Sequence, residues 1–255
     1  MIKPQHPILR VKNLQKHFDD LVAVDGISFV LQRGETLGIV GESGCGKSTT
    51  ARLIMGLEKP TEGEIFLEER DQDHWFMRDT KGYRRKIQYV FQDPIMSLNP
   101  RKTIAQLLEL PLKNMTKLSR EQRTERVIEL MQWVNLRSEF LNRYPHEFSG
   151  GQCQRIGIAR ALATEPDILV LDEPVSALDV SVQAQILNLL KELQQRLGLT
   201  YLFISHDLAV IEILCDKVLV MYQGKVVEQG PRARIFGDPQ HDYTKKLLSS
   251  VPRFH

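Results

Sequence analysis

The sequence predicts an α/β protein built on a largely parallel sheet, and three stretches carry that prediction. The apolar run "TLGIV" (36–40) leads into a glycine-rich loop and then into the helical pattern "TTARLIMGL". The run "DILVLDEP" (167–174) precedes an amphipathic helix that Gly198 should end. A third apolar run, "TYLFISHD" (200–207), follows that helix. Buried strands that alternate with helices are typical of parallel sheets with helices on their faces.

Other short strands surround these three stretches. The runs "GISFVLQ" (26–32), "GEIFL" (63–67) and "KIQYVF" (86–91) have strand character, with turn signals at Arg33-Gly34 and Glu62-Gly63. We expect the early antiparallel runs to be additions to the parallel sheet.

The middle and the end of the chain differ in pattern. Residues 94–160 are predicted to be mainly helical, and the clearest helix begins where Ser119 and Gln122 form a candidate capping box. Near the end, "KVLVMYQGKVVEQG" (217–230) predicts a hairpin.

Composition excludes several classes of protein. The chain has 255 residues, of which 42% are hydrophobic and 26% charged, as in ordinary folded proteins. Its net charge of +2 is too small to indicate binding to nucleic acid or anionic lipid. The N-terminus lacks the apolar core of a signal peptide, and no apolar run approaches the roughly 18 residues of a membrane span. We therefore expect neither export nor a membrane span.

The three cysteines, Cys45, Cys153 and Cys215, are far apart and show no metal-ligand spacing. A reducing cytosol is therefore the expected environment.

A phosphate-binding loop is the strongest chemical signal. The pattern G-x-x-x-x-G-K-[ST] is formed by Gly41, Glu42, Ser43, Gly44, Cys45, Gly46, Lys47 and Ser48. Glycines let successive N–H groups surround an anion, and the following helix N-terminus adds donors. We expect Lys47 to reach the β- and γ-phosphates and the Ser48 hydroxyl to ligate Mg²⁺. The alternative is a glycine-rich turn with a solvated lysine.

The loop alone does not separate a kinase, a GTPase, a helicase and a transporter ATPase. No N-K-x-D guanine-reading motif is present, so ATP is the preferred nucleotide.

Two acids end the run "ILVLDEP". At the end of a strand both side chains can reach the edge where α/β sheets bind ligands. We expect Asp172 to bind Mg²⁺, through water, and Glu173 to act as general base on a water that attacks the γ-phosphate. The alternative is a plain turn.

A second glycine-containing helix start lies at "FSGGQCQR" (148–155). Ser149 and the N–H groups of Gly150 and Gly151 would form another anion site. Such a site is useful if it covers the γ-phosphate of a nucleotide bound to another copy of the protein. The alternative is an ordinary N-cap followed by a tight packing position.

In this order the motifs resemble those of ATP-binding cassette (ABC) ATPases over nearly the whole chain. Gly41 to Thr49 matches the Walker A motif, and "ILVLDEP" matches Walker B. "VFQDP" is similar to the Q-loop, in which Gln92 would touch Mg²⁺ and sense the γ-phosphate. "FSGGQ", which ends at Gln152, resembles the signature LSGGQ with phenylalanine in place of leucine.

Three further segments extend the resemblance. "SALD" with Asp179 is similar to the D-loop, and "ISHD" places His206 at the switch histidine that contacts the γ-phosphate. "KHF" places Phe18 where the family stacks an aromatic ring, more often tyrosine, on adenine.

The resemblance implies an α/β P-loop NTPase fold: one ABC ATP-binding domain over 1–255, with a RecA-like core and an antiparallel β subdomain in about 1–92 and 160–235. An α-helical subdomain with the signature would span 93–159, and a C-terminal tail 236–255. Two such units would enclose two ATP head to tail, each signature closing the partner's Walker A site. The implied Mg²⁺ ligands are Ser48, Gln92 and Asp172. The residues implied to be catalytic are Lys47, Gln92, Glu173 and His206.

A narrower resemblance is to the ATPase subunits of oligopeptide and dipeptide importers and their nickel-importing relatives. It is carried by "FQDPIMSLNPRKT" (91–103), "PHEFSGGQCQR" (145–155) and "HDYTKKLLSSVP" (241–252). It implies two membrane permease subunits as partners, a second ABC ATPase subunit (an identical copy or a related one) and, indirectly, an extracytoplasmic binding protein. The chain would lie on the cytoplasmic face of the cell membrane, with no nucleic acid partner. Many members carry a cysteine cluster after the last segment; this one has none there, and we expect no iron–sulfur centre.

Several alternatives stay open. The cargo could be nickel or a metal chelate, or another substrate such as an antimicrobial peptide. A soluble ABC ATPase of DNA repair or translation is disfavoured, because the repair type needs a long coiled-coil insertion and the translation type usually has two cassettes. A binding-only regulatory cassette is disfavoured by the presence of both Glu173 and His206.

Two groups of residues have no assigned chemistry. The apolar residues Ile95, Met96 and Leu98 could contact a permease helix or pack within their own lobe. In the charged region 68–82, Trp75 and Phe76 are expected to be packed or at an interface.

Overall fold

A computed structural model describes residues 7–249, and the chain divides into two units. The first unit contains the described residues up to Tyr83 and those from Thr200 onward, and the second is Arg84–Leu199. Residues 1–6 and 250–255, which belong to the predicted domain and its C-terminal tail, lie outside the described residues. Within residues 7–249 no helix is long and apolar enough to cross a membrane.

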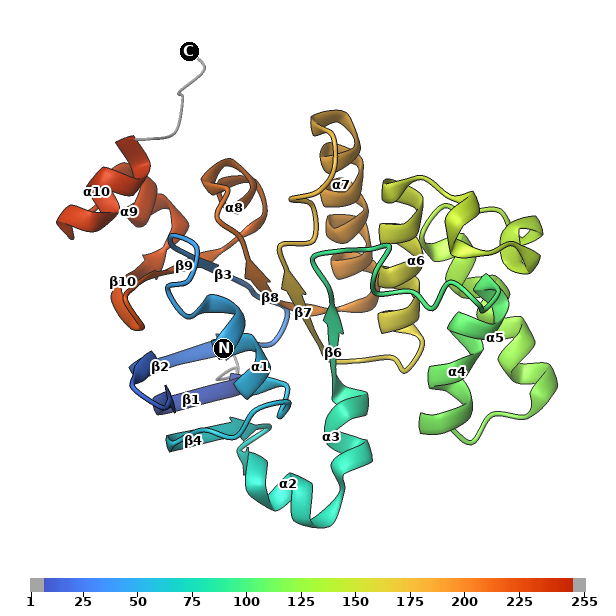
Figure 1. The fold of residues 1–255 in the computed structure, drawn as a ribbon, viewed down its shortest axis with the longest axis horizontal. Coiled ribbons are helices and arrows are strands. Elements are labelled where there is room, and N and C mark those ends of the chain that lie inside the picture. The colour runs from blue at the N-terminus through green and yellow to red at the C-terminus, as the bar shows by residue number, and fades with distance from the viewer. Residues whose placement is uncertain (1–6, 250–255) are drawn as a thin grey trace, which may run out of the picture. The chain divides into compact units, whose positions relative to one another are not determined.

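The first unit contains two sheets. Its strands are β1 Pro7–Phe18, β2 Leu21–Gln32, β3 Thr36–Val40, β4 Glu62–Leu67, β5 Arg70–Asp71, β8 Thr200–Ile204, β9 Lys217–Tyr222 and β10 Lys225–Pro231. Strands β2-β1-β4-β5 form an antiparallel sheet in that order, and β1, β2 and β4 lie side by side in blue and cyan (Figure 1). The early antiparallel strands thus form a sheet of their own.

The second sheet of this unit contains the strand that leads into the glycine-rich loop. Its order here is β10-β9-β3-β8, and β3 pairs in parallel with both β8 and β9. β9 and β10 form the predicted hairpin, which turns at Gln223 and Gly224. All five residues of β3 are buried, as its unbroken apolar sequence requires.

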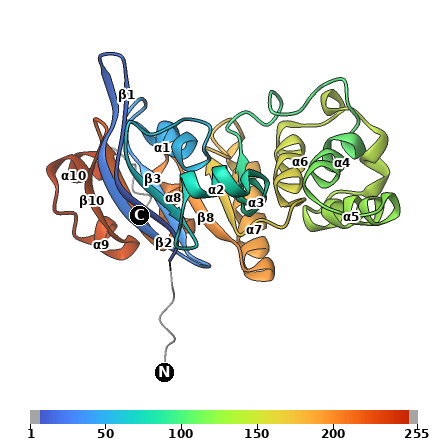
Figure 2. The same ribbon diagram turned by 90° about the horizontal axis from the view of Figure 1, so that it is seen from below.

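The helices of the first unit are α1 Lys47–Ile54, α2 Gln72–Arg78, α8 Leu208–Leu214, α9 Arg232–Gly237 and α10 Asp242–Ser249. α3 Thr80–Lys86 continues into the second unit. α9 and α10 lie beside β10 in both views (Figures 1 and 2). Trp75 of α2 is 5% exposed and its Nε1 donates to the Leu67 carbonyl, so this residue is packed.

One predicted turn is wrong. Glu62 and Gly63 begin β4 instead of forming a turn. The backbone of Gly63 has φ 93°, and a Cβ there would lie 2.3 Å from the Asn13 carbonyl oxygen. The glycine is needed because two strands approach closely where the β1–β4 register shifts, between Lys12 and Gln15.

The second unit combines two parallel strands with a group of helices. Its elements are β6 Ile87–Val90, α4 Ile104–Met115, α5 Arg120–Trp133, the 3₁₀ turns Ser138–Asn142 and Pro145–Glu147, α6 Gly150–Leu162, β7 Ile168–Asp172 and α7 Val180–Leu197. α4, α5 and α6 pack against one another, as the green and yellow ribbons show (Figure 2). The helical middle of the chain is thereby confirmed.

Local signals at helix ends account for several boundaries in this unit. The predicted capping box at the start of α5 is present: the Ser119 hydroxyl accepts from the Gln122 N–H, and the Gln122 side chain accepts from the Ser119 N–H. α7 ends at Gly198, whose φ of 65° is left-handed.

Candidate functional site

The phosphate loop connects β3 to α1, as the sequence predicts. Gly46 precedes the helix with φ 106°, and a Cβ on it would lie 2.3 Å from the Ala23 carbonyl oxygen. Only glycine fits this position. α1 therefore begins directly at the loop, in the position where a helix start favours an anion.

Lys47 is held by the loop that it follows. The side chain is 5% exposed, and its Nζ donates to the carbonyl oxygens of Gly41 and Glu42, each at 2.8 Å. The Cys45 sulfur lies 3.9 Å from the same nitrogen. Burial raises the pKa of that thiol, so Cys45 is a neutral neighbour. The lysine is thus buried and partnered, unlike the solvated lysine of the alternative reading.

Two other predicted residues belong to the first unit. Phe18 ends β1 with 40% of its surface exposed, and Lys16 Nζ lies 4.6 Å from its ring centroid. His206 lies two residues after the end of β8 and is exposed, and Asp207 after it caps α8 by accepting from the Ala209 N–H. Both predicted side chains are therefore reachable by a ligand.

In the second unit, Asp172 ends β7 and is buried. Its carboxylate accepts a hydrogen bond from the Tyr89 hydroxyl, which comes from the neighbouring parallel strand β6. Sequence reasoning missed Tyr89. It lies three residues before Gln92, but the contact depends on the β6–β7 register, which no local pattern reveals.

Glu173 leaves the strand in an unusual backbone conformation. Its φ is 47°, a left-handed value that is uncommon outside glycine and often marks functional residues. Gln92 Nε2 donates to Glu173 Oε2 at 2.9 Å. The structure thus brings the predicted Q-loop amide into contact with the predicted general base.

The signature segment starts α6 with a side-chain cap. The Ser149 hydroxyl accepts from the Gln152 N–H at 3.3 Å, and Gln152 Oε1 accepts from the Ser149 N–H at 3.0 Å. A Cβ on Gly151 would lie 2.4 Å from Val182 Cγ1 of α7. The N-cap and the tight packing position of the alternative reading are therefore both present. Ser149 is nevertheless exposed, so the helix start remains open to a ligand.

Asp179 is the N-cap residue of α7 but makes no side-chain cap hydrogen bond. It is exposed, and the apolar Val180 next to it is 81% exposed. A Cβ on Gly150 would lie 3.3 Å from Leu178 Cδ2, which places the signature start beside the predicted D-loop.

The proposed metal ligands fit Mg²⁺ by their chemistry. Ser48 offers a hydroxyl, Gln92 an amide and Asp172 a carboxylate, and all three are the hard oxygen donors that Mg²⁺ takes together with phosphate oxygens. Among the described residues no three His, Cys, Asp or Glu side chains form a group that could hold a metal ion by themselves.

Comparison with known families identifies two matching regions. Residues 24–176 match the family described as ABC transporter, and residues 227–255 match the C-terminal region of oligopeptide/dipeptide transporters. The dipeptide transport ATP-binding protein DppF of Haemophilus influenzae is 52% identical over 99% of this chain and 80% of its own. The oligopeptide transport ATP-binding protein OppF of Bacillus subtilis is 50% identical over 96% of this chain and 82% of its own.

Solved structures agree with the fold. CbiO1 of Clostridium perfringens, part of an ABC transporter complex, superimposes with a TM-score of 0.82 at 33% identity and covers 91% of both chains. The cassette MJ0796, solved as a dimer in a post-hydrolysis state with ADP and phosphate, gives 0.77 at 33% identity over 88% of this chain and 98% of its own. The fold is therefore the P-loop ABC cassette, and the protein is a nucleotide-binding ATPase. The chain belongs to the ABC transporter family, in its branch of oligopeptide and dipeptide transport ATP-binding subunits.

Proposed function

We propose that the protein is the ATP-hydrolysing subunit of a peptide importer and that it works on the cytoplasmic face of the cell membrane. The observation that carries the peptide cargo is the similarity to peptide transport ATP-binding proteins over 96% or more of the chain. The buried, loop-held Lys47 and the Gln92–Glu173 contact support the ATPase part.

The first unit supplies the groups that bind nucleotide. Lys47 and the N–H groups at the start of α1 bind the β- and γ-phosphates, and the ring of Phe18 stacks on adenine. His206 contacts the γ-phosphate from the end of β8. The exposure of Phe18 and His206 and the dipole of α1 support these roles.

The second unit supplies the groups for chemistry. Asp172, Gln92 and the Ser48 hydroxyl of the loop are the groups that would hold Mg²⁺, which would neutralise charge on the phosphates. Glu173 accepts a proton from the attacking water while the new P–O bond forms and the bond to ADP breaks. The Tyr89–Asp172 and Gln92–Glu173 hydrogen bonds hold both carboxylates in defined orientations.

Dimerisation completes the site. Ser149, Gly150 and Gly151 cover the γ-phosphate bound to a second cassette, and Asp179 lies at the same interface. The exposure of Ser149 and Asp179, and an 81% exposed valine beside Asp179, support such an interface. The dimeric structures of a related cassette agree with it.

Permease subunits are the proposed partners of the segment after Gln92. Ile95 and Met96 are 53% and 82% exposed, whereas Leu98 is 2% exposed and therefore buried. We assign the first two to the permease contact. The predicted division into a core with a β subdomain (1–92 and 160–235), a helical subdomain (93–159) and a tail (236–255) remains part of this proposal.

Reconstitution tests the cargo. The tagged chain is purified from membranes with the subunits that accompany it and placed in liposomes with ATP inside and the binding protein outside. We expect uptake of a labelled dipeptide or tripeptide that stops when Lys47→Ala is used. Uptake of nickel without uptake of peptide would replace the proposed cargo, and ATP hydrolysis without any uptake would overturn the transport role.

A further inference from the structure

The phosphate loop is contacted by a residue from the far end of the chain. The backbone N–H of Glu42, the second residue of the loop, donates to the Tyr243 hydroxyl of α10 at 3.1 Å. Tyr243 is 8% exposed, and its ring lies 4.2 Å, centroid to centroid, from that of Tyr222 on β9. The hydroxyl is therefore held at the loop by a packed ring.

The contact acts on the same peptide group that holds the lysine. The Gly41 carbonyl and the Glu42 N–H belong to one peptide unit, which is planar and rotates as a whole. Its oxygen accepts from Lys47 Nζ at 2.8 Å, and its N–H donates to Tyr243. A peptide group that is hydrogen-bonded at both ends is fixed in orientation, and each bond polarises the other.

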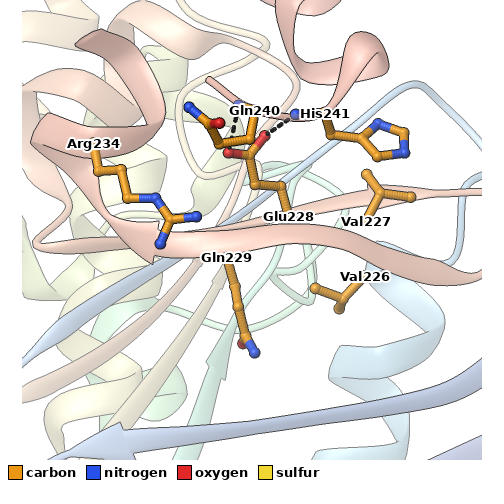
Figure 3. A pocket seen from close by; sticks show the side chains of 7 residues that line it. All are labelled: Val226, Val227, Glu228, Gln229, Arg234, Gln240 and His241. Carbon is orange, nitrogen blue, oxygen red and sulfur yellow. Dashed lines mark hydrogen bonds between the residues drawn. The ribbon is translucent and has the colours of Figure 1, made fainter. Parts of the chain in front are cut away.

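The start of α10 is itself anchored. Glu228 of β10 is 7% exposed, and its two carboxylate oxygens accept from the N–H groups of Gln240 and His241 at 2.9 and 3.0 Å. Figure 3 shows both bonds as dashed lines, on one side of the strand, with Gln229 pointing to the other. The His241 Nδ1 then accepts from the Tyr243 N–H at 3.1 Å. Glu228 thus fixes the turn that presents Tyr243.

We infer that Tyr243 is a positioning residue for nucleotide binding: through the Gly41–Glu42 peptide it sets the orientation of the loop and the position of the Lys47 ammonium. This inference rests on the proposed binding of ATP phosphates by the loop. It assigns a role to the C-terminal segment, which lies outside the Walker A sequence. Because Tyr243 does not touch the phosphates in this role, its effect falls on affinity and not on the chemical step.

The experiment compares Tyr243→Phe with wild type in the full-length chain. Removing the hydroxyl keeps the ring and leaves the Glu42 N–H without its partner. We expect the dissociation constant for ATP to rise roughly three- to tenfold and KM to rise in parallel with little change in kcat. Amide hydrogen exchange at residues 41–46 should accelerate while exchange in β3 stays unchanged. Loss of stability throughout the unit would instead accelerate exchange in β3 as well, and would overturn the positioning role.

Two further variants make the result specific. Tyr222→Phe removes the hydroxyl of the other ring of the same pair, which accepts from the neighbouring Gln223 side chain, and this variant should bind ATP as wild type does. Glu228→Gln should shift affinity in the same direction as Tyr243→Phe, because a neutral amide satisfies only one of the two N–H groups.

The outcomes separate the two proposals. If wild type binds ATP and Tyr243→Phe binds it equally well with unchanged exchange at Glu42, the inference is overturned and the proposed function stands. If wild type binds no nucleotide, the proposed function fails and the inference fails with it.

Discussion

Two helices of this protein begin with glycine-containing segments, and they begin differently. α1 follows a loop that carries its own cation: Lys47 is buried and bonded to loop carbonyls, and the loop is braced by Tyr243. α6 follows Ser149, which is exposed, and the start of this helix is capped by the local Ser149–Gln152 pair.

Two helix starts with similar glycine-containing sequences therefore differ in how strongly they can bind an anion. A loop with a buried lysine is equipped to bind a polyphosphate by itself. A neutral capped helix start offers a hydroxyl and a dipole but no full positive charge, so by itself it is a weak anion site. It becomes useful only when another cassette brings a nucleotide to it.

Glu173→Gln separates binding from chemistry, and we expect the largest effect from it. Turnover should fall by roughly 10²- to 10⁴-fold because the amide cannot accept the proton of the attacking water. ATP affinity should be retained, since neither helix start is altered. Steady-state hydrolysis in the permease complex, beside equilibrium ATP binding, checks both. Normal turnover would refute the assigned base.

Lys47→Ala tests whether the phosphate loop and the start of α1 bind nucleotide without a second cassette. The ATP affinity of the isolated chain should fall by about one to two orders of magnitude, because the charge-assisted bonds to phosphate are lost. Lys59→Ala, at an exposed lysine after the same helix, is the matched control and should bind normally. Undiminished ATP binding by Lys47→Ala would mean that the buried lysine does not make the start of α1 a stronger anion site than the start of α6.

Ser149→Phe tests whether the start of α6 acts on a nucleotide that is bound to a second cassette. The isolated chain should bind ATP normally, whereas hydrolysis in the dimer should fall by roughly tenfold or more because a bulky ring blocks the partner's γ-phosphate site. The matched control is Ser119→Phe, which removes the same kind of capping box from α5. In a mixed dimer, a fully active site opposite the altered serine would contradict the arrangement.

Acidification tests whether Glu228 anchors the turn that presents Tyr243 to the phosphate loop, and we expect the smallest effect from it. Burial alone would raise the pKa of the Glu228 carboxyl, but the Thr244 side chain, the N–H groups of Gln240 and His241 and the charge of Arg234 outweigh it and hold that pKa below its ordinary value of 4.5. The stabilisation is therefore complete above about pH 4.5 and is lost as the pH falls through the lowered pKa. Amide exchange at Glu42 should accelerate in that acidic range in wild type and much less in Glu228→Gln. Equal acid dependence in both proteins would contradict the proposed anchoring of this turn by Glu228.

Much of the fold was predictable because its signals are local. The strand before the phosphate loop, the capping box at Ser119 and the end of α7 at Gly198 each depend on a few neighbouring residues. Glu62-Gly63 wrongly predicts a turn, because a glycine that lets a neighbouring strand approach closely looks the same in the sequence as one that bends the chain.

The side-chain partners of the candidate site were not predictable in the same way. The hydrogen bond between Tyr89 and Asp172 joins residues 83 positions apart in the sequence. The bond between Tyr243 and Glu42 joins residues 201 positions apart. Such pairs are set by tertiary packing, and a single sequence considered by itself gives no local pattern for them.

Gly151 of α6 lies so close to α7 that a Cβ on it would come within 2.4 Å of Val182 Cγ1. A larger residue at this position would require Val182 or the spacing of the two helices to change before a nucleotide is considered, so packing alone already favours a glycine there. A variant that enlarged residue 151 while trimming Val182 to alanine would restore the room and leave the helix start intact. Its ability to support hydrolysis would reveal whether the ligand imposes a requirement of its own.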